Sequence, residues 1–322
     1  MKCPVCKTNV ALDSPKCSTC GFSDIRFDFI NMEEAEYWRI HVVAPYKMHW
    51  ETGKTSVYED YKEKAKTAKY SDELRIHAGD EWFSCLLIES GAVIVSYYVK
   101  DKFARKITIP KTADGHPVIG IGDGVFADET SLCGSKYGYL SEVILPDTVQ
   151  FIGEKAFYNT GLKRICIPDQ CSTIGAYAFS KTHIQEIVFP QSVKTIPHHV
   201  CSECYQLTSV KITGANVIEN HSFFPCKRLK QITLPSTINR IEECAFSAGE
   251  LRSIYLPPDL KTLNIQAWFS IKHIAFPGNE TAVVGSPSST KPVFYCDNLS
   301  KAKQYADKHG IVCKPLNLFP QN

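Results

Sequence analysis

Large apolar residues recur along much of the chain at intervals of 20 to 23 residues. The recurring pattern is L-x-x-I-x-L-P, in which apolar positions alternate with mostly polar ones. Such alternation is typical of a short β-strand that buries one face. The pattern begins at Leu140, Leu162, Ile184, Leu207, Leu229, Leu251 and Ile271, and a degenerate copy from Ala104 to Pro110 makes eight units.

A second set of apolar positions repeats in phase with the first. Ile or Leu lies about twelve residues after most of the starts, and an aromatic residue lies seventeen after several of them. One unit cannot bury these side chains alone, but stacked units form a continuous core, so the sequence predicts a solenoid. The two sets are Ile152, Ile174, Ile196, Ile218, Ile241 and Leu263, and Phe157, Phe179, Phe246 and Trp268.

The units share further residues. Ile165-Cys-Ile-Pro168, followed by Ile174-Gly-Ala-Tyr-Ala-Phe179, closely resembles the BspA-type leucine-rich repeat of bacterial proteins, and the resemblance extends over residues 104–277. It implies a right-handed leucine-rich-repeat solenoid of β-rich α/β repeats over residues 76–322. Residues 83–102 resemble that family's amino-terminal hairpin cap, and residues 302–309 resemble its closing helix. Thr213 in place of a proline and an insert at residues 128–139 depart from the pattern.

Two C-x-x-C turns lie near the beginning of the chain. Cys3 and Cys6 are separated by ten residues from Cys17 and Cys20. Two such turns can present four thiolates to one tetrahedral Zn²⁺ at about 2.3 Å. Four thiolates leave no position open for water, so we expect a structural zinc ribbon over residues 1–28. Four free cysteines or a redox dithiol pair are the alternative.

Residues 29–75 have the pattern of a helical linker. Asn31 is a suitable N-cap, with Glu33 and Glu34 in the first turn, where the helix dipole favours acids. Pro45 is expected to kink or split this segment. Residues 58–69 alternate lysine with Glu and Asp, which predicts a second, solvated helix.

Composition and charge narrow the function. With 44% hydrophobic and 22% charged residues, the chain has the composition of an ordinary globular protein. Because non-specific nucleic-acid binding needs a surplus of Lys and Arg, the net charge of +2 argues against a nucleic-acid partner. No apolar run is long enough to span a membrane. Met1 to Cys6 include no apolar signal segment, so a cytoplasmic protein with reduced cysteines is expected.

The expected binding surface is the concave face of the solenoid. Strand residues that alternate with the core positions point toward this face. Their mixture of charged, polar and apolar types suits a protein or peptide partner, although a merely solvated sheet is the alternative. The candidate partner-binding residues are Glu142, Arg164, Glu186, Lys211, Gln231, Tyr255 and His273.

Other candidate sites fail on spacing. Gly120-Ile-Gly-Asp-Gly124 has its third glycine misplaced for a dinucleotide loop, and Gly53-Lys-Thr55 lacks the upstream glycine of a phosphate loop. His198-His199-Val-Cys201-Ser-Glu-Cys204 has metal-type ligands, but Cys204 occupies a repeating position and is expected to be buried packing. No catalytic constellation or small-molecule site is evident.

The sequence therefore predicts a non-catalytic interaction scaffold. A cell-surface adhesin, which much of the BspA-type family is taken to be, is one alternative. The absence of a signal segment and the reduced zinc-binding cysteines argue against it. A nucleic-acid-associated protein that uses the ribbon and the lysines of residues 54–69 is another alternative.

Overall fold

The computed structural model of the protein describes residues 56–69, 73–78, 81–99, 105–128, 140–246, 249–266, 268, 270–287 and 291–320. The chain divides into two compact units, Met1–Thr67 and Ala68–Asn322. The four cysteines of the predicted zinc ribbon, the helix expected from Asn31 and most of the insert at residues 128–139 lie outside the described residues. These predictions stay predictions.

The described part of the first unit is helix α3 (Val57–Thr67). The Ser56 hydroxyl caps it by accepting a hydrogen bond from the Glu59 backbone N–H at 3.1 Å. Acids lie in the first turn and lysines in the last, as the helix dipole favours. Only Tyr61 is buried, so the prediction of a solvated, charged helix in this segment is confirmed.

The second unit begins with the predicted hairpin cap. Inward-facing residues such as Phe83, Cys85 and Ile94 are fully buried. Gly91 makes the turn with φ 155°, and a Cβ there would lie 2.6 Å from the Pro117 carbonyl oxygen. The third strand then pairs in parallel with the first solenoid coil. The cap strands are β1 (Glu73–Ala78), β2 (Glu81–Ile88) and β3 (Gly91–Val99). Strand β3 pairs with β6 (His116–Ile121) of the first coil, and β6 also pairs with β5 (Thr112–Ala113).

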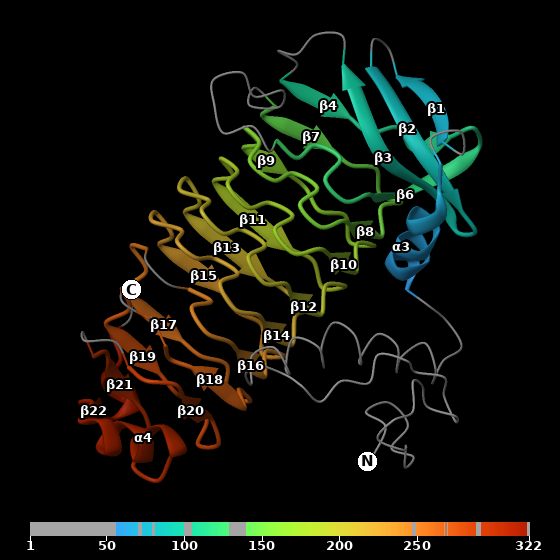
Figure 1. Ribbon diagram of the computed structural model, residues 1–322. Coiled ribbons are helices and arrows are strands. Elements are labelled where there is room, and N and C mark those ends of the chain that lie inside the picture. The colour runs from blue at the N-terminus through green and yellow to red at the C-terminus, as the bar shows by residue number, and fades with distance from the viewer. Residues whose placement is uncertain are drawn as a thin grey trace, which may run out of the picture. The chain divides into compact units, whose positions relative to one another are not determined.

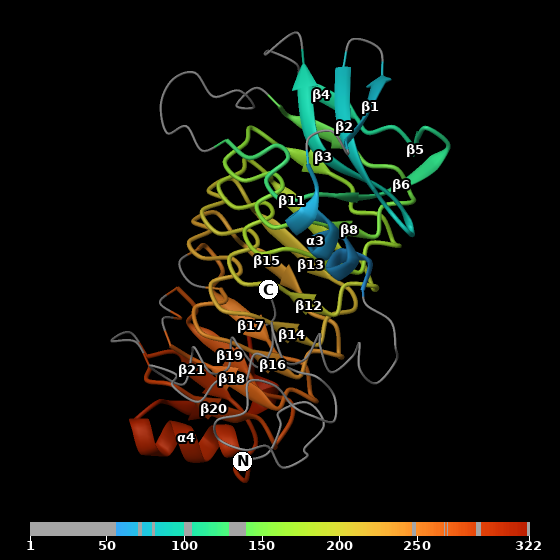
Figure 2. The ribbon, with the colours of Figure 1, turned by 45° about the vertical axis from the view of Figure 1, so that its right-hand side comes forward.

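Each later coil contributes a first strand at L-x-x-I-x-L and a second strand at the next apolar pair. The strands form two stacks along the solenoid, in which groups of neighbouring strands pair in parallel (Figures 1 and 2). The first strands are β4 (Lys106–Thr108), β7 (Glu142–Ile144), β9 (Arg164–Ile165), β11 (Glu186–Phe189), β13 (Ser209–Ile212), β15 (Gln231–Thr233), β17 (Ser253–Tyr255), β19 (His273–Ala275) and β21 (Val293–Tyr295). The second strands are β8 (Phe151–Ile152), β10 (Thr173–Ile174), β12 (Thr195–Ile196), β14 (Val217–Ile218), β16 (Arg240–Ile241), β18 (Thr262–Asn264) and β20 (Ala282–Val284).

A ladder of aromatic rings runs through the core. Phe157 stacks on Phe126 at 5.1 Å and on Phe179 at 5.7 Å between ring centroids. Phe223, Phe246 and Trp268 continue the ladder in later coils. All these rings are buried. The aromatic positions predicted from the repeat are therefore core positions, and each coil depends on its neighbours for burial.

The solenoid closes as the sequence predicted. Helix α4 (Lys301–His309) begins at Ser300, whose hydroxyl accepts from the Lys303 N–H at 3.1 Å, and it ends at Gly310 in a left-handed conformation. Strand β22 (Cys313–Lys314) then adds to β21, and a short 3-10 helix, η3 (Leu316–Leu318), follows. The coil that contains β21 was not predicted, because it begins at Lys291 and not at an apolar residue.

Candidate partner-binding surface

The candidate surface lies on the outward side of the first strands. Strand β11 shows the alternation clearly, since Ile187 and Phe189 are buried while Glu186 and Val188 are exposed. We call the two columns of residues at these outward positions, from β7 to β19 and with Tyr295 of β21 added, the strand strip. Its first column is Glu142, Arg164, Glu186, Ser209, Gln231, Ser253 and His273, and its second column is Ile144, Cys166, Val188, Lys211, Thr233, Tyr255, Ala275 and Tyr295.

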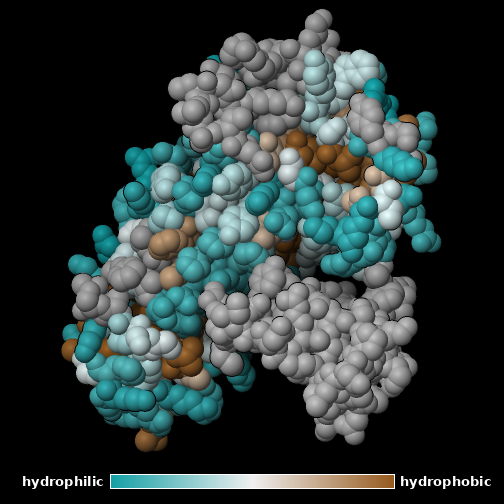
Figure 3. All heavy atoms as spheres, viewed as in Figure 1, coloured by the Kyte–Doolittle hydropathy of each residue, from teal (hydrophilic) through white to brown (hydrophobic). Residues whose placement is uncertain are grey.

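The early coils leave the strip open and chemically mixed. Ile144 is 40% exposed and Val188 is 50% exposed, and Cys166 between them is also exposed. Glu142 pairs in register with Arg164 and lies 3.6 Å from the Lys106 ammonium. In the view of Figure 3, the described residues are mainly hydrophilic, with apolar patches among them. Interspersed charged and apolar side chains of this kind suit a protein or peptide surface.

The last coils of the strip are covered by the chain itself. Ala275 is fully buried, and Tyr295 and Ser253 are almost so. The Phe319 ring meets Tyr295 edge-on at 5.3 Å and Tyr255 at 5.8 Å between centroids. The segment that follows β22 therefore lies over this end of the strip. The repeat periodicity does not predict this segment. The apolar residues of Leu316-Asn-Leu-Phe319, after the closing helix, are only a weak signal for it.

The structure brings the predicted partner-binding residues onto one face. Arg164, Glu186, Lys211 and Gln231 are exposed, and Glu142 is half-buried. Tyr255 is 55% exposed despite its contact with Phe319. His273 is half-buried, and its Nδ1 hydrogen-bonds the Tyr295 hydroxyl at 3.1 Å. Its imidazole is therefore already engaged within the chain.

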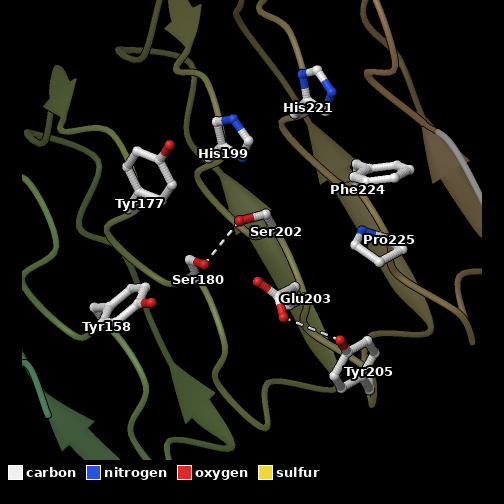
Figure 4. A pocket seen from close by; sticks show the side chains of 10 residues that line it. All are labelled: Tyr158, Tyr177, Ser180, His199, Ser202, Glu203, Tyr205, His221, Phe224 and Pro225. Atoms are coloured by element: carbon white, nitrogen blue, oxygen red, sulfur yellow. Dashed lines mark hydrogen bonds between the residues drawn. The ribbon is translucent and has the colours of Figure 1, made fainter. Parts of the chain in front are cut away.

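A second surface feature lies on the turns that follow the second strands. It is a trough of about 420 Å³ that crosses several coils (Figure 4). One wall is a stack in which His199 lies 4.6 Å from Tyr177 and 4.9 Å from His221. The floor holds Ser180 and Ser202, whose hydroxyls are 2.8 Å apart. Residues of the stack have left-handed backbones, with φ of 55° to 58°.

The trough is close to neutral in its centre. Burial, together with the nearby His221 and His198, lowers the pKa of His199 to about 4, so this imidazole is uncharged at pH 7. Glu203 lies 3.7 Å from the Lys181 ammonium, which compensates its charge. The apolar pattern gives no sign of the trough, because the trough residues occupy turn positions that this pattern leaves unspecified. His199, Ser202 and Glu203 do belong to the segment 198–204, whose metal-type ligands stand out in the sequence.

The buried cysteines near the trough fill the core. Cys201 occupies the ladder position between Phe179 and Phe223, and Cys204 and Cys226 lie beside it, all fully or almost fully buried. Burial raises the pKa of the Cys201 and Cys226 thiols well above the usual value. A raised pKa makes a poor nucleophile. Within the part of the chain that the structure describes, no group of three His, Cys, Asp or Glu side chains could hold a metal ion.

Comparison with known families matches the BspA type leucine rich repeat region in six copies, over residues 94–217 and 213–305. The chain belongs to this family. Comparison with curated proteins finds no significant match. Among the described residues, no helix is long and apolar enough to cross a membrane.

Several solved structures are similar. A T. pallidum leucine rich repeat protein is 24% identical, with 77% of this chain and 97% of that chain covered and a TM-score of 0.41. A leucine rich cell surface protein from Faecalibacterium prausnitzii is 22% identical, with 69% and 76% covered and a TM-score of 0.40. A leucine-rich repeat protein from Bacteroides ovatus is 17% identical, with 71% of each chain covered and a TM-score of 0.38.

Proposed function

We propose that the protein is a non-catalytic interaction scaffold that binds a protein or peptide partner through the strand strip. The observation that carries the proposal is the second column of the strip, where Ile144, Val188 and Tyr255 project from stacked parallel strands and are 40 to 55% exposed. Exposed aliphatic and aromatic side chains among charged neighbours are the composition of a protein-binding surface. The charged first column would set the register and orientation of the partner.

We also propose a structural zinc ion on Cys3, Cys6, Cys17 and Cys20. Such a site requires reduced thiols, which supports a cytoplasmic scaffold over a surface adhesin. Metal analysis should find one zinc per chain, and Cys3→Ser with Cys20→Ser should lose it. An unchanged zinc content in that variant would contradict the assignment.

The binding proposal is tested by affinity capture with three full-length proteins. The wild type is compared with a strip variant that carries Arg164→Ala, Glu186→Ala and Tyr255→Ala. The matched control carries Lys194→Ala, Asp169→Ala and Tyr205→Ala, which remove a cation, an acid and an exposed tyrosine away from the strip.

A partner that the wild type and the control retain, and that the strip variant loses, supports the proposal. Equal capture by the strip variant and the wild type places binding outside the strip and overturns the proposal, whether or not the control, whose Tyr205 lines the trough, retains the partner. Fractionation of the native cells distinguishes a cytoplasmic scaffold from a cell-surface adhesin, since surface exposure of the chain would favour the adhesin. Capture of nucleic acid with a steep salt dependence would favour the third alternative.

A further inference from the structure

We propose that residues 315–320 are an internal peptide ligand of the strand strip, and that Phe319 occupies the position where an aromatic side chain of a partner peptide docks. The inference rests on the proposed function, in which the strip is the binding surface, and it names the chemistry of the partner at one end of that surface.

The docking position is a notch one coil wide. In the second column Tyr255 pairs in register with Ala275, and Ala275 pairs with Tyr295. Adjacent parallel strands lie about 4.8 Å apart, so the two tyrosines are about 10 Å apart across a single small residue. Because alanine leaves this space unfilled, an inserted ring can contact both tyrosines and cover Ala275.

Phe319 fills this notch. Its ring is edge-on to both tyrosines, at interplanar angles of 73° to Tyr255 and 86° to Tyr295. Edge-to-face contacts at these centroid distances are favourable, because the positive edge of one ring meets the negative face of another. Ala275, which lies between the two tyrosines in register, is buried, whereas the residues of the same column in the early coils are exposed.

The segment is anchored before the notch and only lightly held over it. The Lys314 carbonyl accepts from the Cys296 N–H at 3.1 Å, so β22 stays paired with β21. In residues 315–320 the backbone hydrogen bonds are local: the Leu318 N–H donates to the Pro315 carbonyl, and the Phe319 N–H donates to the Leu316 carbonyl. Leu318 is 59% exposed. Release of residues 315–320 would therefore break the ring contacts and leave the sheet intact.

A tethered ligand with such modest contacts is well suited to exchange. A short tether gives an effective concentration of about millimolar, so a weak contact stays populated without a partner. A partner peptide with the same aromatic anchor and further contacts along the open coils would displace it. Lys211 and Thr233, which precede Tyr255 in the column, are exposed and lie on the path of such a peptide.

The probe for this proposal is a labelled synthetic peptide with the sequence of residues 314–322. Its binding to full-length proteins is followed by fluorescence anisotropy. Phe319→Ala opens the notch, and this variant should bind the peptide at least about tenfold more tightly than the wild type, whose own Phe319 competes. Leu318→Ala is the matched control and should behave as the wild type.

Two further measurements make the result specific. A peptide with alanine at the position of Phe319 should bind neither protein, and the double variant Phe319→Ala with Tyr255→Ala should lose the unmodified peptide. Thermal melting of Phe319→Ala checks that the fold is retained. Equal binding by Phe319→Ala and the wild type, or equal binding of both peptides, overturns the proposal.

The two proposals fail separately. If the peptide does not bind but a captured partner is lost in the variant Arg164→Ala with Glu186→Ala, the internal-ligand proposal is wrong and the scaffold stands. If the peptide binds in the notch but that variant keeps every partner, the notch is real and the strip is not the general binding surface.

Discussion

The early and late coils of the strand strip share one backbone geometry and differ in what covers them. Ile144 and Val188 stand open in the second column, while Ala275 and Tyr295, further along the same column, are buried. Neither the register nor the strand spacing accounts for the contrast, since parallel pairing is maintained at both ends. The cover is a short segment outside the repeat. A periodic surface therefore need not be uniformly available to a partner.

The largest expected difference is in stability, when one side chain of the second column is truncated to alanine at each end of the strip. Tyr295→Ala removes a buried ring that bonds His273, and should lower the free energy of unfolding by about 3–5 kcal/mol. Val188→Ala removes exposed surface only and should change it by less than about 0.5 kcal/mol. Chemical denaturation of both variants measures the difference. Equal losses would show that the two ends are equally packed.

The rate of thiol labelling compares a cysteine of the covered late coils with a cysteine of the open early coils. Burial raises the pKa of Cys296 to about 12, and its side chain is 2% exposed, whereas Cys166 on the open coils is exposed. Cys166 should therefore react at pH 8 at least about a hundredfold faster, because the thiolate is the reactive form. Mass spectrometry of timed samples identifies the sites. Rapid labelling of Cys296 in the native protein would contradict the burial of this coil.

A smaller effect on stability tests the hydrogen bond between Tyr295 and His273, which lies at the covered end of the strip. Tyr295→Phe keeps the ring but leaves His273 without its hydroxyl partner, and should cost about 1 kcal/mol of unfolding free energy. Tyr255→Phe alters an exposed residue and should cost less than about 0.5 kcal/mol. Denaturation midpoints at pH 7 are sufficient to compare them. The same loss in both would mean that the hydrogen bond contributes nothing.

A pH effect tests the trough, which serves as a reference surface away from the strip. The pKa of His199 is about 4 in the folded protein and about 6.5 when unfolded, so the unfolded state binds more protons between these values. Stability should therefore fall as the pH drops from 6.5 to 4, by less than the shift alone implies, because solvent screens the half-buried imidazole. His199→Asn, which also tolerates the left-handed backbone, should flatten that part of the profile. NMR titration of His199 with a pKa near 6.5 would contradict the burial of the stack.

Much of this contrast could be predicted, and part of it could not. The spacing of Ile and Phe predicted the core and the outward-facing strip, because these follow from local alternation repeated in every coil. Both caps were predicted from the resemblance to the BspA-type repeat. The coil at Lys291 was missed because it begins with a polar residue. The cover over Tyr295 was missed because it depends on one ring, Phe319, reaching a distant strand. Non-local contacts of this kind leave no periodic signal.

The central claim is that the strand strip binds the partner. Hydroxyl-radical footprinting of the full-length protein, free and in complex with the captured partner, tests it most directly. We expect protection of Ile144, Val188 and Tyr255, with Tyr158 and Tyr177 of the trough unchanged. Protection confined to the trough, or to residues before Ala68, would contradict the claim.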